Sequence, residues 1–177
     1  NLAWALLLYS YADVHKIRVV SGVTVSEIYY TSTDGKIVEP NKDAFSAEIA
    51  SNTYENGQGV ITLAGDINSM NIGANAFEYC TTLETITIPD NIISIGSKAF
   101  YSCTGLTSIK LPESVNSIGD YAFGYCSSLT SINIPSGVST IDLGTFQNCT
   151  ALESITIPNN VTTIKAGAFA SCSALTS

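Results

Sequence analysis

Basic residues are scarce in this chain. Its 177 residues include seven Lys and Arg against fifteen Asp and Glu, which gives a net charge of -8. Three of the basic residues, Lys98, Lys110 and Lys165, are spread thinly over the C-terminal part of the chain. Binding to phosphates or to an anionic membrane surface needs clustered Lys and Arg. We therefore expect no nucleic-acid partner and no attachment to anionic lipid.

Residues that carry chemistry are also few. The single histidine, His15, has no Ser or Cys nucleophile motif around it. The sequence contains no phosphate-binding Gly-rich loop, no HExxH and no GxSxG. Paired carboxylates such as Glu78 and Glu84 flank apolar residues that point inward, and this leaves them on a solvated edge. We expect no enzyme activity, no catalytic residues, no cofactor and no metal site.

The apolar run Leu2–Leu8 (LAWALLL) is too short to span a bilayer. Its length is that of the core of a secretory signal, although no initiator Met or basic segment precedes it. We interpret residues 1–12 as the remnant of a cleaved signal and residues 1–25 as leader and linker. The alternative is a strand or helix that packs on the first unit of the following array. The signal interpretation predicts a secreted or cell-surface protein without a membrane span.

What the sequence does have is an internal repeat. Its five cysteines recur every 23 residues, with a Phe three residues before each one and a Leu three residues after it. The cysteines are Cys80, Cys103, Cys126, Cys149 and Cys172. At 45% hydrophobic residues the chain is too apolar to be disordered. A fixed period of this length predicts a solenoid in which each unit packs on its neighbours.

One unit can be interpreted along its length. Ile109 and Leu111 alternate inward as in a short strand, and Pro112 ends that strand. Val115 and Ile118 follow as an extended back segment. From Asp120 to Cys126 the apolar residues have helical spacing, with Asp120 placed to cap a single turn. We predict a right-handed leucine-rich-repeat array of 23-residue coils, with strands on one face and short helical turns on the other.

The N-terminal part before the array, residues 26–65, is predicted to be a β-hairpin cap. Two β-prone runs flank Asp34-Gly35, a pair that favours a hairpin turn. The run Val60–Leu63 looks like the first strand of the solenoid. The array itself is expected over residues 66–177, as four full coils with partial ends. Because it stops without a polar capping segment, we expect the natural protein to continue beyond Ser177.

The pattern A-F-x-x-C-x-x-L-x-x-I-x-I-P-x-x-V-x-x-I-G resembles the BspA-like leucine-rich repeat from about Ile67 to Ser177. That family occurs in large secreted or surface proteins of anaerobic and gut-dwelling bacteria. The resemblance implies a non-enzymatic bacterial surface protein that adheres to protein ligands, such as host extracellular matrix, epithelial or bacterial proteins. The alternative is a structural stalk that displays other domains.

The cysteine column allows three interpretations. Adjacent coils stack at about 4.8 Å, a Cα separation that a disulfide tolerates. Equivalent side chains in a stack run parallel, however, so that pairing would require them to leave their rotamers. Five is an odd number, and one thiol per coil does not converge on a metal. We favour buried reduced thiols that fill core space over disulfides or a metal site.

The remaining candidate sites are on the surface. On the strand face the outward positions form a small polar ladder, which is our candidate ligand-binding surface: Thr85, Thr87, Ser108, Lys110, Ser131, Asn133, Ser154 and Thr156. Binding hot spots favour Trp, Tyr and Arg, and none occurs in this ladder. A solvated face in a spacer therefore stays open as an alternative. The tyrosines of the turn side form a second candidate patch, or part of the core: Tyr79, Tyr101, Tyr121 and Tyr125.

Overall fold

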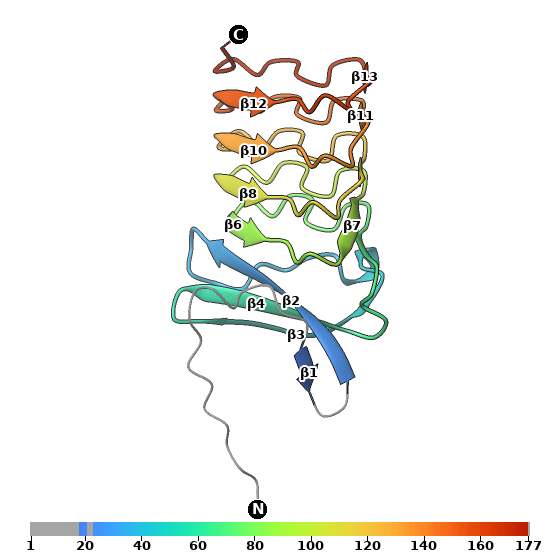
Figure 1. Cartoon of the computed structure of the whole chain (residues 1–177). Coiled ribbons are helices and arrows are strands. Elements are labelled where there is room, and N and C mark those ends of the chain that lie inside the picture. The colour runs from blue at the N-terminus through green and yellow to red at the C-terminus, as the bar shows by residue number, and fades with distance from the viewer. Residues whose placement is uncertain (1–17, 21–22, 177) are drawn as a thin grey trace, which may run out of the picture.

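The computed structural model describes residues 18–20 and 23–176. These form a β-solenoid whose coils stack in register, with an antiparallel sheet at its N-terminal end (Figure 1). The expected signal remnant at residues 1–12 lies outside the described residues, as does most of the expected leader.

One strand of each coil lies on the same face of the solenoid (Figure 1). These strands are β6 (Leu83–Thr87), β8 (Ser108–Lys110), β10 (Ser131–Asn133) and β12 (Ser154–Thr156). They pair in parallel at the 23-residue period, so that Ile86, Ile109, Ile132 and Ile155 form one row. The array of 23-residue coils with a strand on one face is thus confirmed.

The back of the coils also contains short parallel strands. A three-stranded sheet comprises β5 (Met70–Ile72), β7 (Ile92–Ile95) and β9 (Ser117–Ile118). A second pair comprises β11 (Thr140–Ile141) and β13 (Thr163–Ile164). The corner between the two faces turns at proline, because the Pro112 carbonyl accepts a hydrogen bond from the Val115 amide at 3.1 Å.

Phenylalanine rings form the centre of the core. Phe77, Phe100, Phe123 and Phe146 are fully buried. Consecutive rings from Phe77 to Phe169 stack at 5.1 to 5.7 Å with interplanar angles of 3 to 12°. Offset stacking of this kind contributes stability beyond the burial of apolar area. The column therefore joins each coil to the next.

The prediction of a short helical turn on the other face is wrong. The amides of Lys98, Phe100 and Ser102 donate to carbonyls of the following coil at 2.8 to 2.9 Å. The amides between them bond within the coil, as Tyr101 does to the Lys98 carbonyl at 3.1 Å. Lys98 and Ser102 also adopt φ values of 55° and 57°, in the left-handed region. In a helix, every amide beyond the first turn donates to a carbonyl of the same helix. Here every second amide bonds to the neighbouring coil, so the segment forms consecutive turns and not a helix.

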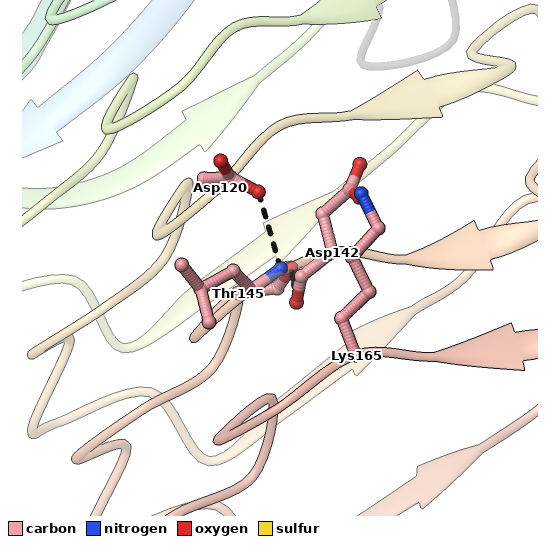
Figure 2. A network of polar contacts seen from close by, with 5 residues as sticks. Asp120, Asp142, Thr145 and Lys165 are labelled. Atoms are coloured by element: carbon pink, nitrogen blue, oxygen red, sulfur yellow. Dashed lines mark hydrogen bonds and ion pairs between the residues drawn. The ribbon is translucent and has the colours of Figure 1, made fainter.

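Asp120 does not cap such a helix. Its carboxylate accepts a hydrogen bond from the Leu143 amide of the next coil at 3.2 Å (Figure 2). Beside it, Asp142 and Lys165 form an ion pair across two coils. One coil before Asp142, the same position is occupied by Gly119, where a Cβ would lie 2.6 Å from the Ser97 backbone nitrogen. This corner thus changes from close backbone contact to side-chain pairing along the array.

The N-terminal sheet contains β2 (Val23–Ser32), β3 (Glu48–Glu55) and β4 (Gln58–Ala64). The short strand β1 (Arg18–Val20) pairs with the start of β2, and a 3-10 turn (Lys42–Ala44) precedes β3. β2 pairs antiparallel with β4 along one edge and with β6 along the other. It therefore joins the N-terminal sheet and the strand face into one eight-stranded sheet.

Two predictions for this region are wrong. The hairpin is β3–β4, which turns at Asn56-Gly57 with φ values of 52° and 82°. The run directly after Asp34-Gly35 does not form a strand. The run Val60–Leu63 belongs to β4, antiparallel in the N-terminal sheet, and is not a coil strand. The segment after Gly35 is too short before Pro40 to make a second strand, whereas long runs flank Asn56-Gly57 on both sides.

Candidate binding surface on the strand face

The eight predicted ladder residues lie together in two columns on β6, β8, β10 and β12. Thr85, Ser108, Ser131 and Ser154 are in register in one column, and Thr87, Lys110, Asn133 and Thr156 form the other. Their side chains alternate with the inward isoleucines, which is the period of two expected for a strand. All eight line an open hollow with a volume of about 1050 Å³.

Other residues that the sequence did not suggest also line this hollow. They include Glu113, Ser136 and Pro158, which follow the strands at the corner. The Ser136 amide and hydroxyl donate to the Glu113 carboxylate at 3.0 and 2.9 Å. These hydrogen bonds, with a smaller effect of Lys110, lower the pKa of Glu113. The carboxylate is therefore charged at neutral pH, close to the positive charge of Lys110.

Two members of the ladder already have structural hydrogen bonds. Asn133 accepts from the Leu111 amide at 2.9 Å and donates to the Leu111 carbonyl at 2.8 Å. The Thr85 hydroxyl lies 2.8 Å from the hydroxyl of Thr31 in β2. These residues join neighbouring strands, whereas Ser108, Lys110, Ser131, Ser154 and Thr156 are exposed. The exposed members are thus the ones best placed to contact a ligand.

The tyrosines of the turn side also lie together. Tyr101 contacts Tyr79, Tyr121 and Tyr125 with ring centroids 5.8, 6.5 and 5.2 Å apart. Tyr79 and Tyr125 are 64% and 40% exposed, while Tyr101 and Tyr121 are half-buried. The Lys98 ammonium lies 5.4 Å from the centre of the Tyr101 ring. Tyr79 and Tyr125 therefore belong to the surface, whereas Tyr101 and Tyr121 pack partly against the turns.

The cysteines are free thiols along the core. Cys103, Cys126 and Cys149 are buried, and each donates to a phenylalanine carbonyl of an earlier coil at 3.0 to 3.1 Å. Burial raises the pKa of Cys80 to about 11 and that of Cys149 to about 12. The thiolate, which is the nucleophilic form, is therefore scarce at neutral pH.

Within residues 18–20 and 23–176, no three His, Cys, Asp or Glu side chains are grouped as metal ligands. Over the same residues, no helix has the length and apolar character needed to cross a bilayer.

The chain is similar to a known repeat family and to solved bacterial repeat structures. Residues 47–177 match the BspA type leucine rich repeat region in six copies, a match that begins upstream of the expected Ile67. A leucine-rich repeat protein of T. pallidum is 34% identical with a TM-score of 0.58, over 59% of this chain and 49% of that one. One from Bacteroides ovatus is 28% identical with a TM-score of 0.52, over 68% and 31%. No functionally curated protein matches the chain.

The chain thus spans about half the length of the T. pallidum protein and about a third of the Bacteroides protein. The repeat pattern, the in-register coils and the six matched copies agree with one another. The chain belongs to the BspA-type leucine-rich repeat family.

Proposed function

We propose that this chain is part of a secreted or cell-surface bacterial protein that binds protein ligands through the strand face, without enzyme activity. Leucine-rich repeats are generally scaffolds for protein contact, and the resemblance to BspA-like proteins supports a location at the bacterial surface. Host extracellular matrix proteins, epithelial proteins and proteins of other bacteria are the proposed partners.

The observation that carries this proposal is the hollow on the strand face with its in-register polar ladder. The inward residues of β8 and β10, Ile109 and Ile132, are buried, whereas Ser108 and Ser131 beside them are exposed. The fold therefore does not need the side chains of Ser108 and Ser131, which are free to vary with the ligand. A solenoid repeats such a surface over several coils, and this suits an extended protein partner.

A structural stalk is the second candidate. It is favoured by the chemistry of the same ladder, which contains only Ser, Thr, Asn and Lys. Large binding contributions usually come from Trp, Tyr and Arg in desolvated pockets. The stalk predicts that the chain retains no specific protein, whereas the binding function predicts that it does.

A pull-down of host matrix and epithelial proteins with the immobilised chain separates the two functions. The double variant Ser108→Arg/Ser131→Arg places two large side chains in the hollow. Its matched control, Ser117→Arg/Ser139→Arg, makes the same changes at exposed positions away from the ladder. We expect the first variant to lose the retained protein and the control to keep it. Retention of nothing by the unmodified chain would support the stalk instead.

A further inference from the structure

The outer strand of the N-terminal sheet has an unpaired edge. β3 is the last strand in the order of the sheet and pairs only with β4, its hairpin partner. No other backbone group of the described residues bonds to its eight residues. In an antiparallel pair, alternate residues direct their N–H and C=O groups away from the partner strand. The outward groups of β3 can therefore accept one more strand.

This edge is held in a fixed position by side chains on its inner face. The Tyr30 hydroxyl donates to Asn52 Oδ1 at 2.8 Å, and Asn52 Nδ2 donates to the Val38 carbonyl at 2.9 Å. The Val38 amide donates back to the Tyr30 hydroxyl at 3.2 Å, and this closes the network. The Tyr54 ring packs on the Tyr30 ring, with ring centroids 5.9 Å apart. An edge that is already ordered needs less ordering when a ligand binds.

The charges around the edge are negative. Glu48 and Glu55 are exposed at the two ends of β3. Between Val25 and Ser69 there are seven acidic residues against two lysines. Opposite charges across neighbouring strands stabilise pairing, and like charges destabilise it. The edge therefore favours a strand with basic residues near both of its ends.

A second copy of this chain fits the edge less well. If two β3 strands pair antiparallel over their full length, Glu48 of one copy lies opposite Glu55 of the other. Both ends of the pair then place two carboxylates together. This repulsion resists self-pairing, as charged edges do in other sheets.

A hollow of about 530 Å³ lies at the start of β3. Its apolar part is formed by Phe45, Ala47 and Ile49, and its charged residues are two carboxylates, Asp43 and Glu48, and one ammonium, Lys42. A peptide bound along a strand edge obtains specificity from pockets for its alternate side chains. The hollow can take one apolar side chain, with a neighbouring basic group near the two carboxylates.

We propose that the free edge of β3 binds an extended peptide segment that has basic residues at both ends. The segment adds a ninth strand to the eight-stranded sheet, places its basic groups beside Glu48 and Glu55, and directs an apolar side chain against Phe45 and Ile49. This site does not depend on the strand face, because it lies at the other end of the sheet (Figure 1).

The probe is a synthetic octapeptide of alternating Val and Thr with Lys at both ends, titrated into the ¹⁵N-labelled full chain and followed by amide NMR shifts. One control peptide carries Glu at both ends, and another has alternate backbone amides N-methylated. The variant Glu48→Lys/Glu55→Lys reverses the charge of the edge. Its control, Asp90→Lys/Glu153→Lys, makes the same net change at exposed positions elsewhere.

We expect shifts at β3 and β4, and a Lys peptide that binds about threefold to tenfold tighter than the Glu peptide at low salt. Glu48→Lys/Glu55→Lys should bind the Glu peptide tighter than the Lys peptide, whereas the control variant should still prefer the Lys peptide. The N-methylated peptide should not bind. The proposal would be overturned if millimolar peptide caused no shifts or shifted only the strand face. It would also be overturned if both variants preferred the same peptide. Protection, in the free chain, of the β3 amides that point away from β4, whether by another segment or by a second copy, would also overturn it.

Discussion

The Phe45 ring meets the Phe77 ring edge-on, with centroids 5.8 Å apart and an interplanar angle of 90°. Phe77 is the first ring of the stacked column, so Phe45 covers the column at its N-terminal end. Phe45 precedes β3 and has no place in the 23-residue pattern. The N-terminal sheet and the array therefore share one aromatic core.

Removal of Phe45 should uncover the array from one end. Phe45→Ala is expected to lower the free energy of unfolding by about 3 kcal/mol, because a buried aromatic side chain is lost. Since coils contact only their neighbours, hydrogen exchange should rise in the N-terminal sheet and the first coil. Phe123→Ala should instead raise it in the middle coils. Ile37→Ala, at a side chain that is 42% exposed, is the control and should change neither. An even rise along the chain in either Phe variant would contradict this account.

The cysteine column can be tested by a pair of substitutions. The Cys126 thiol donates to the Phe100 carbonyl at 3.1 Å in fully buried surroundings. Cys126→Ser keeps a donor at this position and should cost about 1 kcal/mol or less. Cys126→Ala removes both the donor and the packing of the sulfur, and should cost about 1–2 kcal/mol. Urea unfolding measures which of the two variants is more stable. An Ala variant more stable than the Ser variant would show that the hydrogen bond contributes nothing.

Stability should fall in alkaline solution. Burial raises the pKa of Cys149 from 9.0 to about 12 in the folded chain, while the unfolded thiol ionises at its ordinary value. The unfolded state therefore loses protons first as the pH rises above about 9, and stability decreases up to the folded pKa. The melting temperature should drop between pH 9 and pH 11, and the drop should be smaller in Cys126→Ser/Cys149→Ser. Equal drops in the two proteins would assign the effect to other groups, such as Tyr30, whose pKa is also raised by burial.

The corner glycines should not tolerate a side chain. A Cβ at Gly119 would lie 2.6 Å from the Ser97 nitrogen and 2.9 Å from the Gly96 carbonyl carbon, both of which are backbone atoms. Gly119→Ala should therefore destabilise the chain by about 1–3 kcal/mol, because the two coils must separate. Thermal unfolding measures this change. Ser117→Ala, two residues earlier at an exposed position, is the control and should be nearly neutral. A Gly119→Ala variant as stable as this control would show that the coils can separate freely at the corner.

The phase of the coils follows from the sequence, whereas the turn geometry does not. The spacing of Ala99, Phe100 and Cys103 fits a helical turn and consecutive turns equally well. Which one forms depends on the amides that bond to the next coil, such as Phe100 to the Ala122 carbonyl. Such bonds exist only after the coils stack. Residue type gives little guidance, since Tyr121 and Tyr125 adopt left-handed φ values of 56° and 61° that Asn or Gly would favour.

The N-terminal sheet was harder to predict than the array. β3 contains Ser51, Asn52 and Thr53 in sequence, so it has no apolar alternation to mark it as a strand. The pairing of β2 with β6 joins residues more than fifty positions apart and reverses the strand direction within one sheet. Neither feature has a local pattern. The strand-face ladder, in contrast, follows directly from the alternation around Ile109 and Ile132.

Amide hydrogen exchange of the chain, with and without a protein recovered in the pull-down, tests the binding role of the strand face most directly. Slower exchange on binding is expected at β8, β10 and β12, because a ligand in the hollow covers these strands. Little change is expected at the back strands β7, β9 and β11. Protection confined to the back strands or to the tyrosine side, with β8 and β10 unchanged, would contradict the account.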